Sequence, residues 1–328
     1  MRSAFRNLLD LAAGPTDTRR RPPLRYSVQI DRLPPDSALR QTLVPCDCDE
    51  GTQQWLDATA SPSLLKQWIA TLLTCCVSRT TANGFVNRGG MHVVSEAQAE
   101  RLLATSLSGP DGVARPDASL LDIGAGDGGV TARIRQRFAR VYATEASATM
   151  RWRLRQRGFI VSDMPHPRRY DCVALLNVLD RCDEPLKLLR DIRDVYMKPD
   201  GVLFVAVVLP WCPFVENGTE KKAPKETLPL QGARCRDKPT FEAAASLLAT
   251  RVFEAEGFTV EKWTRLPYLC EGNSTNAYFV LDDAVFTLRI AGGAHAGMNG
   301  STAASVSAAV SAAGATTMTI DGLNRIVP

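Results

Sequence analysis

The stretch SLLDIGAGDG at residues 119–128 places a glycine-rich turn directly after a short apolar run. Residues 119–123 have the length of a buried strand, and glycine at 124, 126 and 128 lets the backbone pass close to a ligand where a Cβ atom would clash. Downstream, short apolar segments alternate with helical patterns. This alternation predicts an α/β fold in which helices cover both faces of a parallel sheet.

The expected elements can be given as residue ranges. We predict strands over 119–123, 141–143, 159–161, 172–176, 202–209, 259–264 and 278–288, and helices over 61–77, 95–105, 130–138, 148–156, 185–195 and 241–256. Ligands of parallel sheets bind beyond the carboxyl ends of the strands. The residues that follow the strands are therefore the candidates for a site.

Acidic residues flank the glycine-rich turn at Asp122 and Asp127. Carboxylates there would repel a pyrophosphate, but they suit the positively charged sulfur and amino group of S-adenosylmethionine. Glu145, at the end of the second predicted strand, is placed to accept from ribose hydroxyls. We therefore predict an S-adenosylmethionine site that includes Asp122, Gly124, Gly126 and Glu145.

Two alternatives to this cofactor stay open. Gly124, Gly126 and Gly129 also match the G-x-G-x-x-G pattern of dinucleotide-binding proteins, and a carboxylate at 145 suits the ribose of either cofactor. A glycine turn with a purely structural role is the other alternative.

A polar cluster follows the strand predicted at 172–176. Asn177 offers both a donor and an acceptor, and Asp180 could accept a proton or orient a nucleophile. The alternative is that an aspartate caps the helix that begins near Pro185, which we expect of Asp183 and leave open for Asp180. After the strand at 202–209, Trp211 and Phe214 are candidates to line a substrate groove.

Charge and cysteine spacing exclude some classes of function. Residues 1–40 carry eight arginines and four aspartates, which accounts for the net charge of +4, so the remaining chain is balanced. A balanced body argues against a nucleic-acid partner. The nine cysteines include no Cys-x-x-Cys pair, so we predict no metal site. Without a secretory signal or an apolar span, we expect a cytoplasmic monomer with no membrane span.

Composition divides the chain into four parts. We predict an Arg/Pro-rich flexible extension over 1–45, a helical segment packing on the core over 46–110, the main α/β domain over 111–290, and a flexible tail rich in Ala, Gly, Ser and Thr over 291–328.

Several longer strings are similar to the DREV methyltransferases, the methyltransferase-like protein 9 family. They are SRTTANGFVNRGGMHV (78–93), LLDIGAGDG (120–128), YATEAS (142–147), LLNVLDRCDEPLKLLRDI (175–192), LPWCPFVENG (209–218), TRLPYLCEG (264–272) and YFVLDDAVF (278–286). The resemblance implies a class I, seven-strand, Rossmann-like methyltransferase with an N-terminal helical extension. It also implies an enzyme that methylates the N1 (pros) nitrogen of histidine within His-x-His motifs of proteins.

The resemblance also implies roles for single residues. Asn177 and Tyr268 would lie near the cofactor and the acceptor. Asp180 matches an acidic residue of the family and would lie beside the target imidazole as a catalytic residue. Tyr278 is a further candidate for substrate contact, although the segment EGNSTNA before it lacks a tyrosine found in the family, and 220–240 has a different, charged composition. A methyltransferase for a small molecule or RNA, or an inactive cofactor-binding module, are the alternatives.

Overall fold

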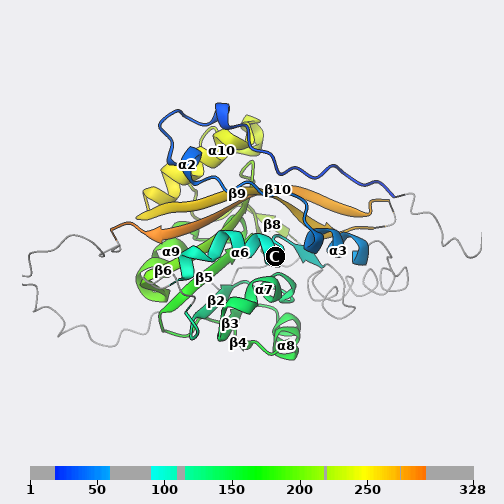
Figure 1. Ribbon diagram of the computed structural model, residues 1–328, viewed down its shortest axis with the longest axis vertical. Coiled ribbons are helices and arrows are strands. Elements are labelled where there is room, and N and C mark those ends of the chain that lie inside the picture. Colours follow the sequence, from blue (N-terminus) through cyan, green and yellow to red (C-terminus); the bar gives the residue numbers. More distant parts are fainter. Residues whose placement is uncertain (1–18, 60–89, 109–114, 218–219, 274, 293–328) are drawn as a thin grey trace, which may run out of the picture.

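The protein is described here by a computed structural model, which covers residues 19–59, 90–108, 115–217, 220–273 and 275–292 (Figure 1). The helix predicted at 61–77 and residues 293–328 of the predicted tail lie outside the described residues.

An eight-stranded sheet forms the centre of the molecule. Its strands are β1 (Met91–His92), β2 (Ser119–Ile123), β3 (Arg140–Thr144), β4 (Ile160–Ser162), β5 (Tyr170–Leu176), β6 (Met197–Val208), β9 (Phe258–Glu271) and β10 (Tyr278–Ile290). They are arranged in the order β1-β9-β10-β6-β5-β2-β3-β4. The strands from β4 to β6 are parallel, and β10, β9 and β1 are antiparallel to their neighbours. This confirms the class I methyltransferase fold, with β1 as an eighth strand paired to β9.

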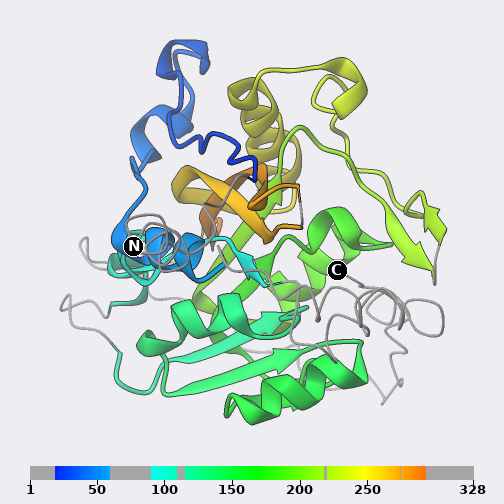
Figure 2. The ribbon, with the colours of Figure 1, turned by 90° about the vertical axis from the view of Figure 1, so that its right-hand side faces the viewer.

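Helices cover both faces of the sheet, as predicted. One face carries α6 (Glu96–Leu103), α7 (Gly129–Ile134) and α8 (Ala148–Gln156), and the other carries α2 (Ala38–Thr42), α9 (Pro185–Asp191) and α10 (Phe241–Leu248) (Figures 1 and 2). α3 (Glu50–Thr59) follows the N-terminal segment. The starts of three predicted helices are explained by side-chain caps, since Ser95, Ser147 and Thr240 each accept from a backbone amide of the first turn.

The helices that follow β5 and β6 end in a single wider turn. π-helical turns over Ile192–Tyr196 and Ala249–Glu254 extend α9 and α10. Short 3-10 turns occur at Ile30–Arg32, Thr105–Leu107, Arg135–Arg137, Leu179–Arg181 and Cys235–Asp237.

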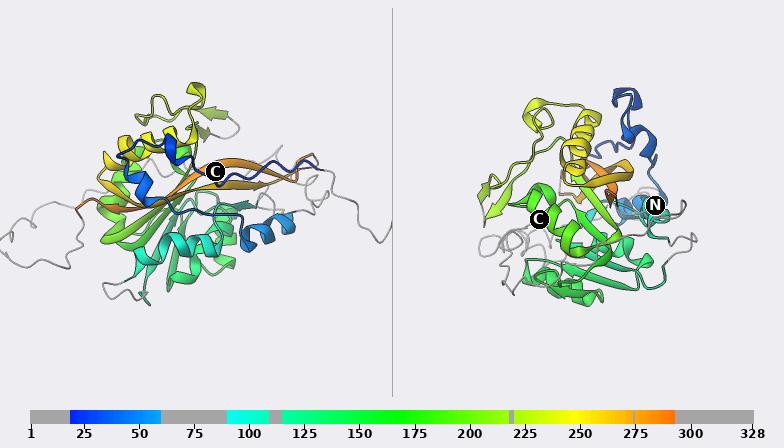
Figure 3. Two further views of the ribbon diagram at one scale, coloured as in Figure 1. Left: turned by 45° about the horizontal axis from the view of Figure 1, so that its top comes forward. Right: turned by 90° about the vertical axis from the view of Figure 1, so that its left-hand side faces the viewer.

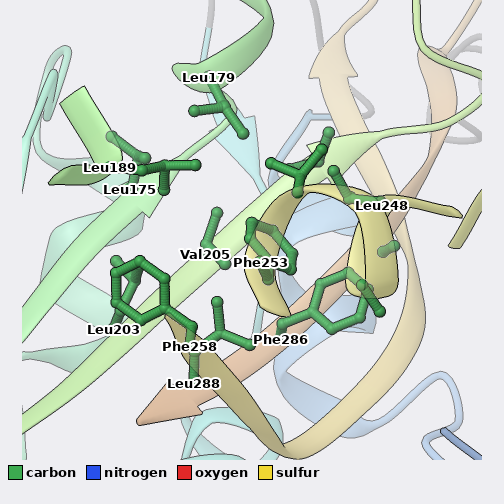
Figure 4. Close-up of a cluster of buried hydrophobic side chains, with 14 of the residues drawn as sticks. Leu175, Leu179, Leu189, Leu203, Val205, Leu248, Phe253, Phe258, Phe286 and Leu288 are labelled. Atoms are coloured by element: carbon green, nitrogen blue, oxygen red, sulfur yellow. The ribbon is translucent and has the colours of Figure 1, made fainter. Parts of the chain in front are cut away.

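The hydrophobic core consists of two layers that the sheet separates. Along β6, Leu203, Val205 and Val207 belong to the layer under α9 and α10, whereas Phe204 and Ala206 belong to the layer under α6 and α7. Figure 4 shows part of the first layer, in which side chains from β5, β6, β10 and the α10 region meet. A strand buried on both faces reads as a continuous apolar run, which is the pattern of residues 202–209.

The hairpin of β9 and β10 extends well beyond the predicted strand at 259–264. Its pairing runs from Phe258 with Ile290 to Glu271 with Tyr278, so β9 continues to 271 (Figure 3). The prediction ended early because Pro267 cannot donate to a strand ladder, so its stretch does not resemble a sheet interior. The extension matters for function, because it brings Tyr268 and Cys270 to the carboxyl edge of the parallel strands.

The N-terminal segment differs from the prediction of a flexible extension over 1–45. Within its described part, the Trp263 indole donates to the carbonyl of Leu39 at 2.7 Å, and the Val44 amide donates to the carbonyl of Trp263 at 2.8 Å. Leu33 and Leu39 are fully buried in the core. These apolar side chains fix residues 19–45 along β9 and β10, although they show no regular period in the sequence (Figure 3).

Candidate active site

The glycine-rich turn connects β2 to α7 in a conformation that requires glycine. Gly124, Gly126 and Gly128 have φ values of 74°, 57° and 79°, in the left-handed region. A Cβ atom at Gly128 would lie 2.7 Å from the Leu154 side chain and 2.8 Å from Phe159. Both the conformation and the close approach therefore exclude larger residues here.

Asp122 and Asp127, which we expected to act together, face different surroundings. Asp122 is buried, accepts from the Thr131 hydroxyl at 2.6 Å, and burial raises the pKa of its carboxyl to about 7. Asp127 instead accepts from the Gly129 amide and pairs with Arg157 at 3.2 Å. Only Asp122 is therefore placed to meet a ligand.

Glu145 holds two segments of the site together. Its Oε2 accepts from the Gly126 amide at 3.1 Å, and its Oε1 accepts from the Ser147 amide at 2.8 Å. The side chain is buried, which raises its pKa. Each carboxylate oxygen has a second lone pair, so the group can still accept from a ligand hydroxyl.

A pocket opens beside the turn, at the carboxyl ends of β2 and β5. It is lined by Met91, Val93, Asp122, Gly124, Ala125, Val130, Leu176 and Tyr268. The pocket thus brings together three of the predicted residues. Met91 and Val93 escaped sequence reasoning because β1 is too short to leave a pattern, and only its pairing with β9 places it here.

Asn177 occupies the corner directly after β5. Its φ of 57° is uncommon for a residue other than glycine. Its backbone N–H donates to the Ala206 carbonyl at 3.0 Å. The side-chain Nδ2 donates to Oδ2 of Asp283 on β10 at 2.7 Å. Sequence reasoning did not single out Asp283, although an acidic residue within the apolar run of β10 was the available signal.

Asp180 lies in the turn after Asn177 and is 2% exposed. Burial raises the pKa of its carboxyl to about 6, despite the favourable charge of Arg181. Arg181 pairs with Oδ2 at 2.5 Å, while Oδ1 is buried and has no hydrogen-bond partner among the described residues. One carboxylate oxygen is therefore available to a ligand.

Tyr268 closes the pocket from the β9 side. Its hydroxyl donates to Sδ of Met91 at 2.8 Å. Burial raises its pKa well above the ordinary value, with further contributions from Cys270, Asp283 and Asp180. We refer to Asn177, Asp180, Tyr268 and Asp283 as the inner polar cluster, because Asn177 donates to Asp283 and the two carboxyl groups raise the pKa of Tyr268.

Two candidates for substrate contact lie elsewhere. Trp211 is 1% exposed and belongs to the core layer under α9 and α10. Tyr278 lies on the opposite face of the hairpin from Tyr268, because side chains alternate along a strand, and its hydroxyl donates to the Pro22 carbonyl at 2.7 Å. Neither residue lines the pocket beside the glycine-rich turn, and their contact with substrate remains a prediction.

Phe214 lies next to the inner polar cluster, but two positively charged side chains lie over its ring. The Arg181 guanidinium lies 3.8 Å and the Lys221 ammonium 3.9 Å from the ring centroid. The Phe214 amide also donates to the Asp180 carbonyl at 3.0 Å. The ring therefore helps to hold Arg181 beside Asp180, and its contact with substrate remains a prediction.

The start of α9 is capped differently from our expectation. Asp183 accepts from the Lys225 amide at 3.0 Å, and Glu226 accepts from the amides of Leu186 and Lys187 at 2.6 and 3.2 Å. A glutamate from the charged segment 220–240 thus supplies the cap. This segment begins with β8 (Glu220–Lys222), which pairs with the preceding strand β7 (Val215–Asn217).

Over the described ranges, no group of three or more His, Cys, Asp and Glu side chains is arranged to hold a metal ion. In the same part of the chain, the helices are too short or too polar to cross a bilayer.

Comparison with known proteins identifies related sequences and folds. The family model described as DREV methyltransferase matches residues 26–290. Similar solved structures include 1,6-didemethyltoxoflavin-N1-methyltransferase of Burkholderia thailandensis with bound S-adenosylhomocysteine, at 21% identity over 53% of this chain and 72% of that one, with a TM-score of 0.36. Another is N-methyltransferase NodS of Bradyrhizobium japonicum in complex with S-adenosylhomocysteine, at 14% identity over 59% and 86%, with a TM-score of 0.35. The [4+2]-cyclase SpnF is 17% identical over 60% and 80%, with a TM-score of 0.36.

Proposed function

The chain belongs to the DREV methyltransferase family, and we propose that it methylates the N1 (pros) nitrogen of histidine within His-x-His motifs of proteins. It is a methyltransferase that uses S-adenosylmethionine and releases S-adenosylhomocysteine. The histidine acceptor is supported by one observation in particular. The buried carboxylate of Asp180 keeps Oδ1 without a partner among the described residues, and an imidazole N–H is a donor that fits it.

The residues around the pocket suit S-adenosylmethionine. When bound, this cofactor supplies a methyl group on a positively charged sulfur. We assign the carboxyl of Asp122 to the positively charged part of the cofactor, and Glu145 to the ribose hydroxyls. The left-handed turn at Gly124 and Gly126 keeps side chains out of the space that the cofactor needs.

Asp180 would select the reactive form of the histidine. An imidazole that donates its tele N–H to Oδ1 of Asp180 carries its lone pair on the pros nitrogen, which is the nucleophile. Bound S-adenosylmethionine would supply the methyl group, with its sulfur leaving, so that the imidazole would become positively charged. The carboxylate then stabilises that cation, and Arg181 keeps Oδ2 in place so that Oδ1 stays available.

The other groups of the inner polar cluster would position the histidine and keep water away from the reacting atoms. The ring of Tyr268 forms part of the pocket wall and excludes water from the reacting atoms. Neutral imidazole is already nucleophilic near pH 7, so alignment is the main contribution required of the enzyme.

Methyl transfer to a defined peptide tests the proposal. Labelled S-adenosylmethionine is incubated with a peptide of repeated Ala-His units and with versions in which each histidine is replaced by alanine. We expect label on the histidine peptide alone, at the pros nitrogen. Asp180→Asn should reduce kcat by tenfold or more while cofactor affinity, measured by calorimetry, stays within twofold of wild type.

A matched control is Asp191→Asn, which removes an aspartate paired with Lys187 on α9 and away from the pocket. Its activity should equal that of wild type. Label that appears on RNA or a small molecule, with none on the histidine peptide, would overturn the proposed acceptor. Full activity of Asp180→Asn would overturn the role of Asp180.

A further inference from the structure

Asp283 is a carboxyl group in the middle of the sheet, directly before the apolar residues Ala284, Val285 and Phe286. It lies on β10 opposite Val208 of β6 and Leu266 of β9, and it is 0% exposed. Burial raises its pKa well above the ordinary value, and the nearby Asp180 raises it further. Burying such a group is costly unless its hydrogen bonds are satisfied. Because burial of this carboxyl group costs free energy, we infer that Asp283 has a role other than packing.

The partner of Asp283 is the side-chain amide of Asn177. The bond from Nδ2 to Oδ2 measures 2.7 Å, and it joins residues 106 apart in the sequence. A carboxyl group accepts this bond whether it is ionised or neutral, so it fixes which end of the amide turns toward β10. The remaining end, Oδ1 of Asn177, is buried without a partner among the described residues.

Asn177 lies beside the pocket along the chain. Leu176, directly before it, lines the pocket, and Asp180 follows three residues later. The left-handed backbone at Asn177 marks a constrained corner, at the carboxyl end of a parallel strand where ligands bind.

We propose that Asp283 is a positioning residue, which holds the amide of Asn177 so that Oδ1 accepts a hydrogen bond from an N–H group of the cofactor or of the methyl acceptor. The proposal rests on the proposed function only for the identity of that acceptor. In this proposal Asp283 acts through Asn177.

Two substitutions of Asp283 separate positioning from packing. Asp283→Leu removes the acceptor and fills the space with an apolar side chain, whereas Asp283→Asn keeps an amide oxygen that can accept from Nδ2. We expect Asp283→Leu to lower kcat/KM by tenfold or more and Asp283→Asn to stay within threefold of wild type. Asp282→Asn is the matched control, because its carboxylate is on the other face of β10 and pairs with Arg265.

Separate measurements identify the N–H donor. If the donor belongs to the cofactor, Asp283→Leu weakens cofactor binding in calorimetry. If it belongs to the methyl acceptor, cofactor affinity is unchanged and the loss is in KM or kcat for the peptide. Either pattern supports the proposal, and an Asp283→Leu enzyme with wild-type affinity, KM and kcat overturns it.

A double mutant and an NMR signal keep the test decisive if Asp283→Leu is unstable. In an Asn177→Ala background, Asp283→Ala, which also removes the acceptor for Nδ2, should cause no additional loss of kcat/KM, and additive losses overturn the proposal. In wild-type protein the Asn177 side-chain NH2 resonance, assigned by its absence from Asn177→Ala, should be protected from exchange. Unprotected exchange contradicts the proposal without reference to any substrate, whereas protection with no label on the histidine peptide contradicts only the proposed function.

Discussion

The carboxylate of Glu145 accepts a hydrogen bond from the amide of Gly126 at 3.1 Å. This bond joins the end of β3 to the turn that follows β2, so the shape of the pocket depends on contact between two neighbouring strands. The other oxygen of Glu145 accepts from Ser147 at the start of α8. A single side chain therefore sets the spacing of three elements.

Glu145→Gln should weaken S-adenosylmethionine binding. Gln has one acceptor oxygen in place of two, so either the turn or Ser147 loses its partner, and a ligand hydroxyl loses a charged acceptor. A lost hydrogen bond to a charged group corresponds to about 1.5–3 kcal/mol, or a tenfold to hundredfold rise in Kd by calorimetry. Glu100→Gln is the control and should leave Kd unchanged, because Glu100 lies on α6 and its partner is Arg137. Equal affinity of wild type and Glu145→Gln would contradict the assignment.

Gly128→Ala should destabilise the protein. The left-handed φ costs a residue with a Cβ atom about 1–2 kcal/mol, and the contacts with Leu154 and Phe159 add about 1–3 kcal/mol of overpacking. The free energy of unfolding, measured in urea, should fall by the sum of these effects. Gly90→Ala serves as the control, because no atom lies within 4 Å of the added Cβ atom. A loss below about 0.5 kcal/mol at Gly128 would contradict the prediction.

Asp122→Asn should change the pH dependence of stability in the cofactor-free protein. Burial raises the pKa of Asp122 from 3.8 to about 7. The folded state therefore binds a proton that the unfolded chain releases, and this stabilisation is lost as the pH rises from about 4 to about 7. Asn cannot ionise, so the Tm of Asp122→Asn relative to wild type should be higher at pH 8 than at pH 5. A relative Tm that is equal at both values, or lower at pH 8, would show that Asp122 ionises normally.

Glu226→Ala should reduce stability by about 1 kcal/mol without changing cofactor affinity. The substitution removes the acceptor for the amides of Leu186 and Lys187 at the start of α9, and lost helix caps typically have this effect. Glu184→Ala is a matched control, since Glu184 occupies the N-cap position without a side-chain cap hydrogen bond. Chemical unfolding and calorimetry measure the two quantities, and equal losses in both variants would refute the capping role.

Much of the fold and part of the site were predictable from local patterns. The Gly124–Gly128 turn, the strand at 119–123 and the helix at 148–156 are encoded by short-range features, namely glycines, apolar runs and caps. Asn177 and Asp180 follow directly after a strand, so chain order alone places them at the ligand edge. The predicted substrate contacts Trp211 and Tyr278 do not line the pocket, since burial and strand face depend on elements distant in the sequence.

The sequence by itself determined that an acidic, glycine-rich turn follows a buried strand in an α/β chain, because backbone conformation and apolar periodicity are local properties. Only the tertiary structure decided which distant groups complete the site. Met91 reaches the pocket through the pairing of β1 with β9, and Asp283 reaches Asn177 through the position of β10 beside β6. These contacts follow from strand order and register, which the whole sheet sets and no short stretch of sequence contains.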